Sequence, residues 1–404
     1  MSAIQASHVY KVFGRRPEAA VEQLEQGVSR DVLREQGTTA AVIDASFDVQ
    51  PGEIFVVMGL SGSGKSTLIR TVNGLLPVTS GEMLVQGQNI VGMDKTRLRQ
   101  IRRDKISMVF QNFALLPHKT VGENAAYGLA INGVNKADRE AKANEALELV
   151  GLGGWGHYLP GELSGGMRQR VGLARALAAG TDIMLMDEAF SALDPLIRRD
   201  MQDQLIELQE KLDKTILFIT HDLNEAMRLG DRIAMMRDGR IEQIGTAEEI
   251  LNDPASNYVA KFVSDVDRTR VLTAGSIAEP PYEVISEEQG PMVAQKILRE
   301  HQPDWLLVVG KGRRPVGMVW ADDVAIAVRD GATSLPYSKV HEMPLVHEDT
   351  PINEMFNHAA QHLAPLVVVD SDGKLVGVVP RVNLLAAVGS NGSDAHETSE
   401  EGTE

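Results

Sequence analysis

Up to about residue 265, short apolar runs alternate with amphipathic stretches. The runs at 54–58, 183–186 and 216–220 are almost wholly apolar, which is typical of strands buried on both faces of a parallel sheet. Stretches with helical periodicity cover 136–152, 165–179 and 195–213. Because strands alternate with helices, the pattern predicts an α/β domain.

The amino-terminal segment has a different order of elements. Strand patterns at 3–12 and 40–49 are separated by a polar segment at 16–36, which we expect to be helical. Residues 82–90 have the pattern of an edge strand, with Gly87 in a turn. The chain is therefore expected to place a polar insertion between its first two strands.

The pattern changes after about residue 265. Residues 304–328 and 365–388 share the order strand, turn, strand, helix, which indicates a weak internal repeat. The last fifteen residues contain five acids and no Lys or Arg, a composition that cannot build a packed core. We therefore predict domains at 1–265 and 266–389, followed by a disordered acidic tail at 390–404.

Composition narrows the class of protein. The absence of cysteine excludes a disulfide scaffold, a zinc ribbon and a thiol nucleophile. A net charge of -16 argues against nucleic acid as the main partner. The longest apolar stretch, 171–186, is interrupted by Arg175 and Asp182, so no segment is expected to span a bilayer. No secretory signal is visible at the start, and we expect a cytoplasmic location.

The sequence GLSGSGKS at 59–66 matches the P-loop pattern, and it follows a predicted strand and opens a predicted helix. Glycines allow backbone N–H groups to approach a phosphate, and the helix N-terminus adds positive potential there. We expect Lys65 to reach the β- and γ-phosphates of ATP and Ser66 to bind Mg²⁺. The expected ATP-binding residues here are Gly59, Ser61, Gly62, Ser63, Gly64, Lys65, Ser66 and Thr67.

The apolar run at 183–186 ends in two acids, Asp187 and Glu188. Asp187 suits a Mg²⁺ ligand, and Glu188, one residue further along the pleat, suits the group that orients the attacking water. Acids at a strand end can also serve solubility alone. The P-loop upstream favours the functional interpretation.

Four further segments decide among the nucleotide-binding families. The run LSGGMRQ at 163–169 resembles the signature motif of ABC ATPases, and Gln111 in MVFQNFALLPH resembles their Q-loop. Ser191-Ala-Leu-Asp194 resembles their D-loop, and His221 resembles their switch histidine. The motifs also occur in the family's order. The resemblance implies a P-loop ABC ATPase domain with an antiparallel β subdomain and a helical subdomain.

The resemblance also implies roles for individual residues. In the family, the signature of one subunit faces the γ-phosphate held by a second subunit, so two copies would enclose two ATP molecules head to tail. Glu188 and His221 would be catalytic, and Ser66, Gln111 and Asp187 would hold Mg²⁺. Phe13 would stack on adenine, with Tyr10 as the alternative and ordinary strand packing as the competing explanation. The signature residues acting across the dimer would be Leu163, Ser164, Gly165, Gly166 and Gln169, and those of the D-loop Ser191 and Asp194.

The type of ABC protein can be narrowed further. One P-loop, one signature and no room for a coiled-coil insertion argue against the translation and DNA-repair types. The motifs, Ala189-Phe190 after Glu188 and the insertion at 15–36 resemble the ATP-binding subunit of glycine betaine/proline importers. This implies a peripheral subunit on the cytoplasmic face of the plasma membrane. Its partners would be a second copy, an integral membrane permease and, indirectly, a substrate-binding protein. A soluble mechanochemical ATPase and a nucleotide-regulated sensor remain the alternatives.

The repeat after residue 265 resembles a pair of CBS modules, which are α+β units that often bind adenosine nucleotides. The usual motif Gly-x-x-Thr-x-x-Asp is altered here: Trp320 and Pro380 replace the threonines, and Asn383 replaces one aspartate. A dimerising or strain-sensing role is therefore at least as well supported as nucleotide binding, with a response to cyclic di-AMP as a further alternative. For the acidic tail, a solubilising role competes with sensing of ionic strength.

Overall fold

The computed structural model describes residues 1–111, 113–264, 269, 271–281, 283–301, 304–339, 343–361 and 364–389. The chain divides into two compact units, Met1–Val263 and Ser264–Glu404, which are described separately here. The acidic tail predicted at 390–404 lies outside the described residues.

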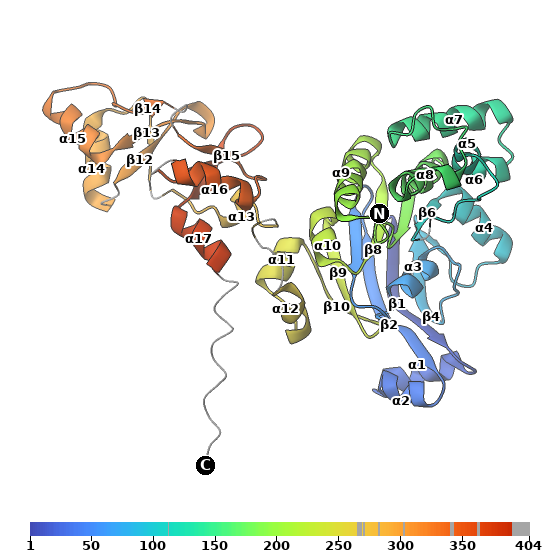
Figure 1. The fold of residues 1–404 in the computed structure, drawn as a ribbon. Coiled ribbons are helices and arrows are strands. Elements are labelled where there is room, and N and C mark those ends of the chain that lie inside the picture. The colour runs from blue at the N-terminus through green and yellow to red at the C-terminus, as the bar shows by residue number, and fades with distance from the viewer. Residues whose placement is uncertain are drawn as a thin grey trace, which may run out of the picture. The chain divides into compact units, whose positions relative to one another are not determined.

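A six-stranded sheet forms the centre of the first unit, in the order β10-β9-β3-β8-β7-β6 (Figure 1). All neighbouring strands are parallel except β10, which pairs with β9 in an antiparallel hairpin. Every residue of β3, β7 and β8 is buried, which confirms the prediction of strands covered on both faces. The strands are β3 (Ile54–Met58), β6 (Ile106–Phe110), β7 (Ile183–Asp187), β8 (Thr215–Thr220), β9 (Arg232–Arg237) and β10 (Arg240–Gly245).

A second, antiparallel sheet has the order β2-β1-β4-β5. Its strands are β1 (Ile4–Phe13), β2 (Thr39–Val49), β4 (Ser80–Val85) and β5 (Gln88–Asn89). Helix α3 (Lys65–Val72) contacts strands of both sheets. One hydrophobic core contains residues from α3 and from both sheets, including Val9, Leu68 and Leu217. This packing fixes the P-loop, which precedes α3, between the two sheets.

Most of the other helices of the first unit fall into two groups. The first group lies along the chain next to strands of the central sheet. Helix α4 (Lys95–Asp104) precedes β6, and the later strands are followed by α9 (Pro195–Leu212), α10 (Leu223–Leu229), α11 (Ala247–Asn252) and α12 (Asn257–Val263). A helical subdomain is inserted between β6 and β7. It consists of α5 (Val121–Ala125), α6 (Tyr127–Ile131), α7 (Lys136–Leu149) and α8 (Gly165–Ala178).

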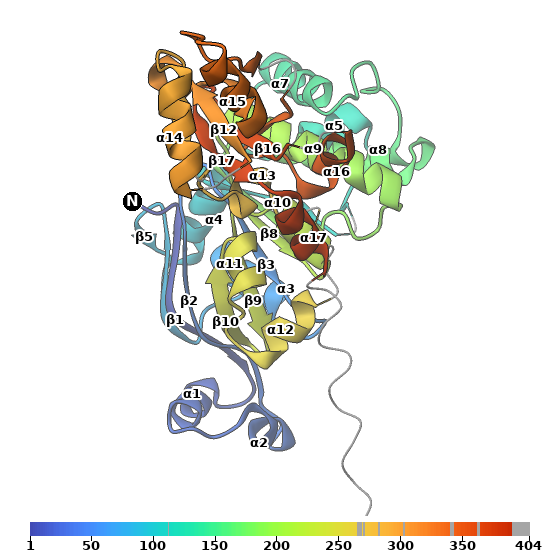
Figure 2. The same cartoon turned by 90° about the vertical axis from the view of Figure 1, so that its left-hand side faces the viewer.

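The polar segment at 16–36 is helical, as the sequence predicted, and it forms two short helices. Helix α1 (Pro17–Glu25) ends before Gly27, whose positive φ of 90° turns the chain. Ser29 then caps α2 (Arg30–Glu35), accepting a hydrogen bond from the N–H of Val32. Figures 1 and 2 show α1 and α2 at the opposite end of the first unit from α7 and α8.

The second unit confirms the internal repeat and extends it. Each copy has the order strand, helix, strand, strand, helix, in which the first two strands are parallel and the last two antiparallel. The first copy contains β11 (Val284–Ser286), α14 (Pro291–His301), β12 (Trp305–Val309), β13 (Pro315–Trp320) and α15 (Ala321–Arg329). The second contains β15 (Leu345–His347), α16 (Ile352–Gln361), β16 (Leu366–Val369), β17 (Leu375–Val379) and α17 (Arg381–Gly389). Outside the two copies lie α13 (Ala274–Ile277) and β14 (Ser338–Lys339).

No helix among the described residues is both long enough and apolar enough to cross a membrane.

A buried carboxyl lies beneath the carboxyl edge of the central sheet. Glu225 of α10 accepts hydrogen bonds from the hydroxyl of Thr220, at the end of β8, and from Nε2 of Gln202 on α9, the latter at 3.1 Å. Burial raises the pKa of Glu225, although these two hydrogen bonds oppose the rise. The group therefore joins α9, β8 and α10 at an electrostatic cost when it is ionised.

This pKa shift predicts how stability depends on pH. A carboxyl whose pKa is higher in the folded chain binds a proton more readily when folded, so folding becomes less favourable as pH rises above the unfolded-state value of about 4.3. Glu225→Gln removes this dependence. The free energy of unfolding of the variant, relative to wild type, should therefore increase as pH rises above about 4.3.

The measurement is urea unfolding at several pH values, followed by Trp155 fluorescence in a chain whose Trp305 and Trp320 are replaced by Phe. Glu210→Gln, at an exposed position of α9, is the matched control and should show no such trend. A pH-independent difference between Glu225→Gln and wild type would contradict the prediction.

Candidate nucleotide-binding site

The P-loop connects β3 to α3 and has a backbone that only glycine allows at two points. Gly59 has φ +152°, and a Cβ there would lie 2.1 Å from the carbonyl oxygen of Met236. Gly64 has φ +106°, and a Cβ there would lie 2.1 Å from the carbonyl oxygen of Ala41. The loop is thus pressed against β9 and β2 with no room for a side chain, which fixes its shape before any ligand binds.

Lys65 is enclosed by the same loop and is only 4% exposed. Its Nζ donates hydrogen bonds to the carbonyl oxygens of Gly59 at 2.7 Å and Leu60 at 3.0 Å. Burial lowers the pKa of Lys65, and the nearby carboxylates of Glu188 and Asp187 act against this. The ammonium is therefore held at the loop by weak carbonyl partners, which an anionic phosphate can replace.

Asp187 ends β7 and is brought against the start of α3. Its Oδ1 accepts a hydrogen bond from the hydroxyl of Ser66 at 2.9 Å, and its Oδ2 lies 3.5 Å from Nη2 of Arg70. A hydroxyl and a carboxylate held together in this way are oxygen donors of the kind that Mg²⁺ prefers. The residues present therefore fit a magnesium ion.

Glu188, the next residue, has a left-handed backbone with φ 47°. Its N–H donates to the carbonyl oxygen of Ile219 at 3.0 Å, which anchors the turn to β8. Its Oε2 lies 3.2 Å from Nδ1 of His221 and 3.1 Å from Nε2 of Gln111. The three side chains come from the ends of β7, β8 and β6, so the parallel sheet gathers them at one edge.

The segment after Glu188 continues this cluster. The hydroxyl of Ser191 donates to the carbonyl oxygen of Glu188 at 2.9 Å and lies 3.3 Å from Nε2 of Gln111. Asp194 caps α9, where its carboxylate accepts a hydrogen bond from the N–H of Ile197 at 3.1 Å. Ser191 therefore joins the cluster that Glu188 forms with His221 and Gln111, whereas Asp194 orients the helix that follows.

Two arginines that the sequence analysis did not single out support these loops. Arg198 contacts Oδ2 of Asp222 at 3.2 Å and the carbonyl oxygen of Leu193 at 3.1 Å, joining the segment after Glu188 to the residue after His221. Arg175 of α8 donates to the carbonyl oxygens of Phe113 and Ala114 at 2.9 and 2.6 Å. Their only signal in the sequence is an arginine at a partly buried helical position, which is too common to be specific.

The signature segment lies at the start of α8. Ser164 is exposed and caps the helix, accepting a hydrogen bond from the N–H of Met167 at 3.3 Å. Gly165 and Gly166 form the first turn, and Leu163 is buried. No hydrogen bond or ion pair among the described residues links this segment to the P-loop of the same chain. Gln169 has no exposed surface, so any effect of this side chain on a ligand would be exerted through the packing of α8.

The two candidate adenine-stacking residues differ in exposure. Phe13, at the end of β1, is 40% exposed, and Nζ of Lys11 lies 4.8 Å from the centre of its ring. Tyr10 is 6% exposed and packs in a hydrophobic cluster with Leu24 and Leu33 of the two short helices. Only the Phe13 ring is accessible to a base.

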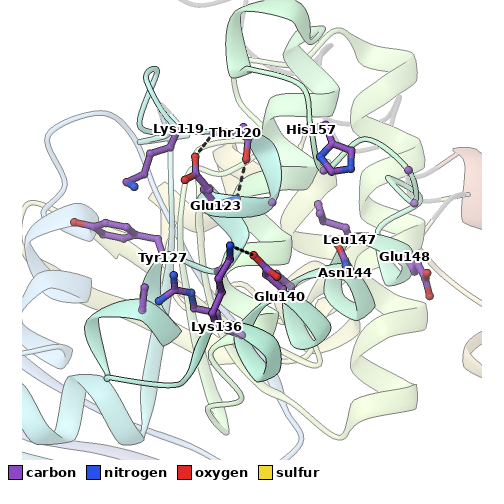
Figure 3. A pocket seen from close by; sticks show the side chains of 18 residues that line it. Lys119, Thr120, Glu123, Tyr127, Lys136, Glu140, Asn144, Leu147, Glu148 and His157 are labelled. Carbon is purple, nitrogen blue, oxygen red and sulfur yellow. Dashed lines mark hydrogen bonds and ion pairs between the residues drawn. The ribbon is translucent and has the colours of Figure 1, made fainter.

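A separate hollow of about 750 Å³ lies in the helical subdomain, away from the P-loop (Figure 3). Residues of α5, α6 and α7 line it, including Glu123, Tyr127 and Lys136. The Lys136 ammonium is 3.8 Å from Oε1 of Glu140, one turn along the same helix. The wall of this hollow therefore carries both charged and aromatic side chains. Its first residue along the chain, Lys119, follows Gln111 closely in the sequence.

Comparison with known proteins places the chain in a family. A family model described as "ABC transporter" matches residues 42–191, and one described as "CBS domain" matches residues 339–390. A glycine betaine/carnitine transport ATP-binding protein of Listeria monocytogenes is 49% identical over 97% of this chain and 98% of its own length. A glycine betaine transport ATP-binding protein of Bacillus subtilis is 48% identical over 96% of this chain and 93% of its own length.

Solved structures give the same result for the first unit. A dimeric bacterial ABC transporter cassette is 32% identical, with a TM-score of 0.52, over 60% of this chain and 98% of its own. A dimeric post-hydrolysis state bound to ADP and Pi is 31% identical, with a TM-score of 0.51. The expected fold class and the family resemblance are both confirmed. The chain belongs to the ABC transporter family, within its group of glycine betaine transport ATP-binding proteins.

Proposed function

We propose that this chain is the ATP-hydrolysing subunit of an importer for glycine betaine, proline or a related osmoprotectant. One observation carries the enzymatic part: the contacts that bring Glu188, His221 and Gln111 together next to the P-loop and Asp187. The transport part is supported by near full-length similarity to glycine betaine transport ATP-binding proteins. That similarity includes the second unit, so it disfavours a soluble ABC ATPase without a membrane partner.

In this proposal the triphosphate of ATP binds in the P-loop. Lys65 exchanges its two carbonyl partners for phosphate oxygens, and backbone N–H groups at the start of α3 contribute further donors. Ser66, Gln111 and Asp187 would hold Mg²⁺, which supplies neutralisation of phosphate charge when bound. Phe13 would stack on the adenine.

Glu188 then orients a water molecule toward the γ-phosphorus. The hydrogen bonds from Gln111 and His221 hold its carboxylate in place, and His221 is positioned to contact the γ-phosphate as well. As the water oxygen bonds to the γ-phosphorus, Glu188 accepts a proton from the water and the bond between the γ-phosphorus and the β,γ-bridging oxygen breaks, which yields ADP and inorganic phosphate; the proton then leaves Glu188 for the phosphate or for solvent. The left-handed backbone at Glu188 sets the direction of the side chain.

The site is completed by a second copy of the chain. Ser164 and the two glycines after it would form an anion site at the start of the 14-residue helix α8, and no hydrogen bond or ion pair among the described residues ties them to the P-loop of the same chain. We propose that it faces the γ-phosphate bound to the partner. Ser191 and Asp194 would then lie near the dimer interface.

The membrane path would come from a separate permease, with a substrate-binding protein acting on that permease. Gln111 begins the loop that leads to α5 and the hollow of Figure 3, so a cytoplasmic segment of the permease that contacts this wall would sense the state of the site. This arrangement would keep the chain on the cytoplasmic face of the membrane. The repeated second unit would adjust the activity of the first.

The first test replaces the proposed water-orienting carboxylate. Glu188→Gln should reduce ATP hydrolysis by about 100-fold or more, because the amide cannot act as a base toward water. ATP binding should persist, so the variant should accumulate as an ATP-bound dimer in size-exclusion chromatography with light scattering. Glu210→Gln is the control and should hydrolyse ATP as wild type does. Hydrolysis by Glu188→Gln at the wild-type rate would contradict the assignment.

The second test addresses transport. A tagged chain purified in mild detergent from its native cells should bring with it a hydrophobic permease, and the complex in liposomes should take up radiolabelled glycine betaine only with ATP. The Glu188→Gln complex should assemble but not transport. A chain that purifies without any membrane protein, and hydrolyses ATP at full rate alone, would favour the soluble ATPase.

A further inference from the structure

The insertion of α1 and α2 leaves the antiparallel sheet beside the proposed adenine platform. It departs directly after Phe13, the last residue of β1, and returns at Thr39, the first residue of β2. Val21 and Leu24 of α1 and Leu33 of α2 pack with Tyr10 into a small hydrophobic cluster. The insertion is therefore anchored on the sheet, and its polar groups are held in defined places.

Arg30, the first residue of α2, reaches from the insertion to the P-loop. Its Nη2 donates a hydrogen bond to the carbonyl oxygen of Gly62 at 3.3 Å, and its Nη1 contacts Oδ1 of Asp238 at 3.1 Å. The side chain is 26% exposed. Because a guanidinium carries several N–H donors in one plane, the Arg30 side chain can donate to Gly62 and to Asp238 at the same time.

Asp238 belongs to the tight turn between β9 and β10, and this turn also forms a hydrogen bond with the P-loop. The N–H of Gly239 donates to the carbonyl oxygen of Ser63 at 2.9 Å. On its other side, Oδ2 of Asp238 lies 3.4 Å from Nε of Arg237. Asp238, whose side chain is 72% exposed, thus lies between two guanidinium groups, and Arg30 pairs with it there.

These contacts act on two successive peptide groups of the P-loop. In a planar trans peptide the C=O and the N–H point in opposite directions. Holding the carbonyl of Gly62 directs the N–H of Ser63, which donates to the carbonyl oxygen of Leu60 at 3.1 Å and closes the loop. Holding the carbonyl of Ser63 directs the N–H of Gly64 away from the turn between β9 and β10. These two backbone N–H groups of the P-loop are therefore oriented by contacts from outside the loop.

We propose that Arg30 is a positioning residue for the P-loop, through which the insertion sets the affinity for ATP. Among the described residues no hydrogen bond or ion pair links Arg30 to Glu188, His221 or Gln111, so Arg30 acts on binding and not on the chemical step. This inference rests on the proposed binding of ATP at the P-loop. Arg30 also adds positive charge close to the loop, which a control must separate from the hydrogen bond.

The test compares Arg30→Ala with Arg34→Ala, which removes the same charge from an exposed position one turn along α2. Loss of a charge-assisted hydrogen bond to the loop should raise the KM and Kd for ATP roughly three- to tenfold in Arg30→Ala, with kcat changed less than about twofold. Arg34→Ala should match wild type. Arg30→Lys should recover only part of the loss, because an ammonium lacks the fork that serves both partners.

A double variant separates the bridge from other effects. If Arg30 and Asp238 act together, Arg30→Ala/Asp238→Ala should bind ATP about as well as Arg30→Ala alone. Equal affinity of Arg30→Ala and wild type, or an equal loss in Arg34→Ala, would overturn the inference while leaving the proposed function intact. A wild-type chain that failed to bind ATP would overturn both.

Discussion

The shape of the P-loop is the constraint on which the rest of the site depends. Gly59 and Gly64 approach backbone carbonyls so closely that no Cβ fits, and Lys65 is folded back onto the loop. Parallel strands β6, β7 and β8 then deliver Gln111, Asp187 and His221 to the same edge. Tight packing of apolar strands therefore supports a compact polar cluster, in which each group is oriented by another.

The two segments proposed to bind phosphate lie at the starts of different helices of the same chain. The P-loop lies at the start of α3, and the signature lies at the start of α8 in the helical subdomain, with no polar contact between them among the described residues. A single copy therefore lacks half of its proposed site. Binding of ATP between two copies would join the halves, and hydrolysis would separate them, which links the chemical step to a change of state.

Much of this could be predicted from the sequence, for particular reasons. The runs at 54–58 and 183–186 are short and apolar, and Lys65, Glu188 and Ser164 belong to motifs with fixed spacing. The split of 16–36 into two helices was missed because polar helical residues hid the turn at Gly27. Arg30 and Arg198 were missed because their partners are distant in sequence, and only the fold brings them together.

The most direct test of the composite site separates ATP binding from pairing. In a Glu188→Gln background, Ser164→Arg blocks the signature while leaving the P-loop unchanged, and ATP stoichiometry is measured together with mass by light scattering. We expect a monomer that binds one ATP through its P-loop, more weakly than the dimer because the partner's signature contributes no contact, and that does not dimerise. A variant that still forms the ATP-bound dimer with the affinity of the Glu188→Gln parent would contradict a site shared between two copies.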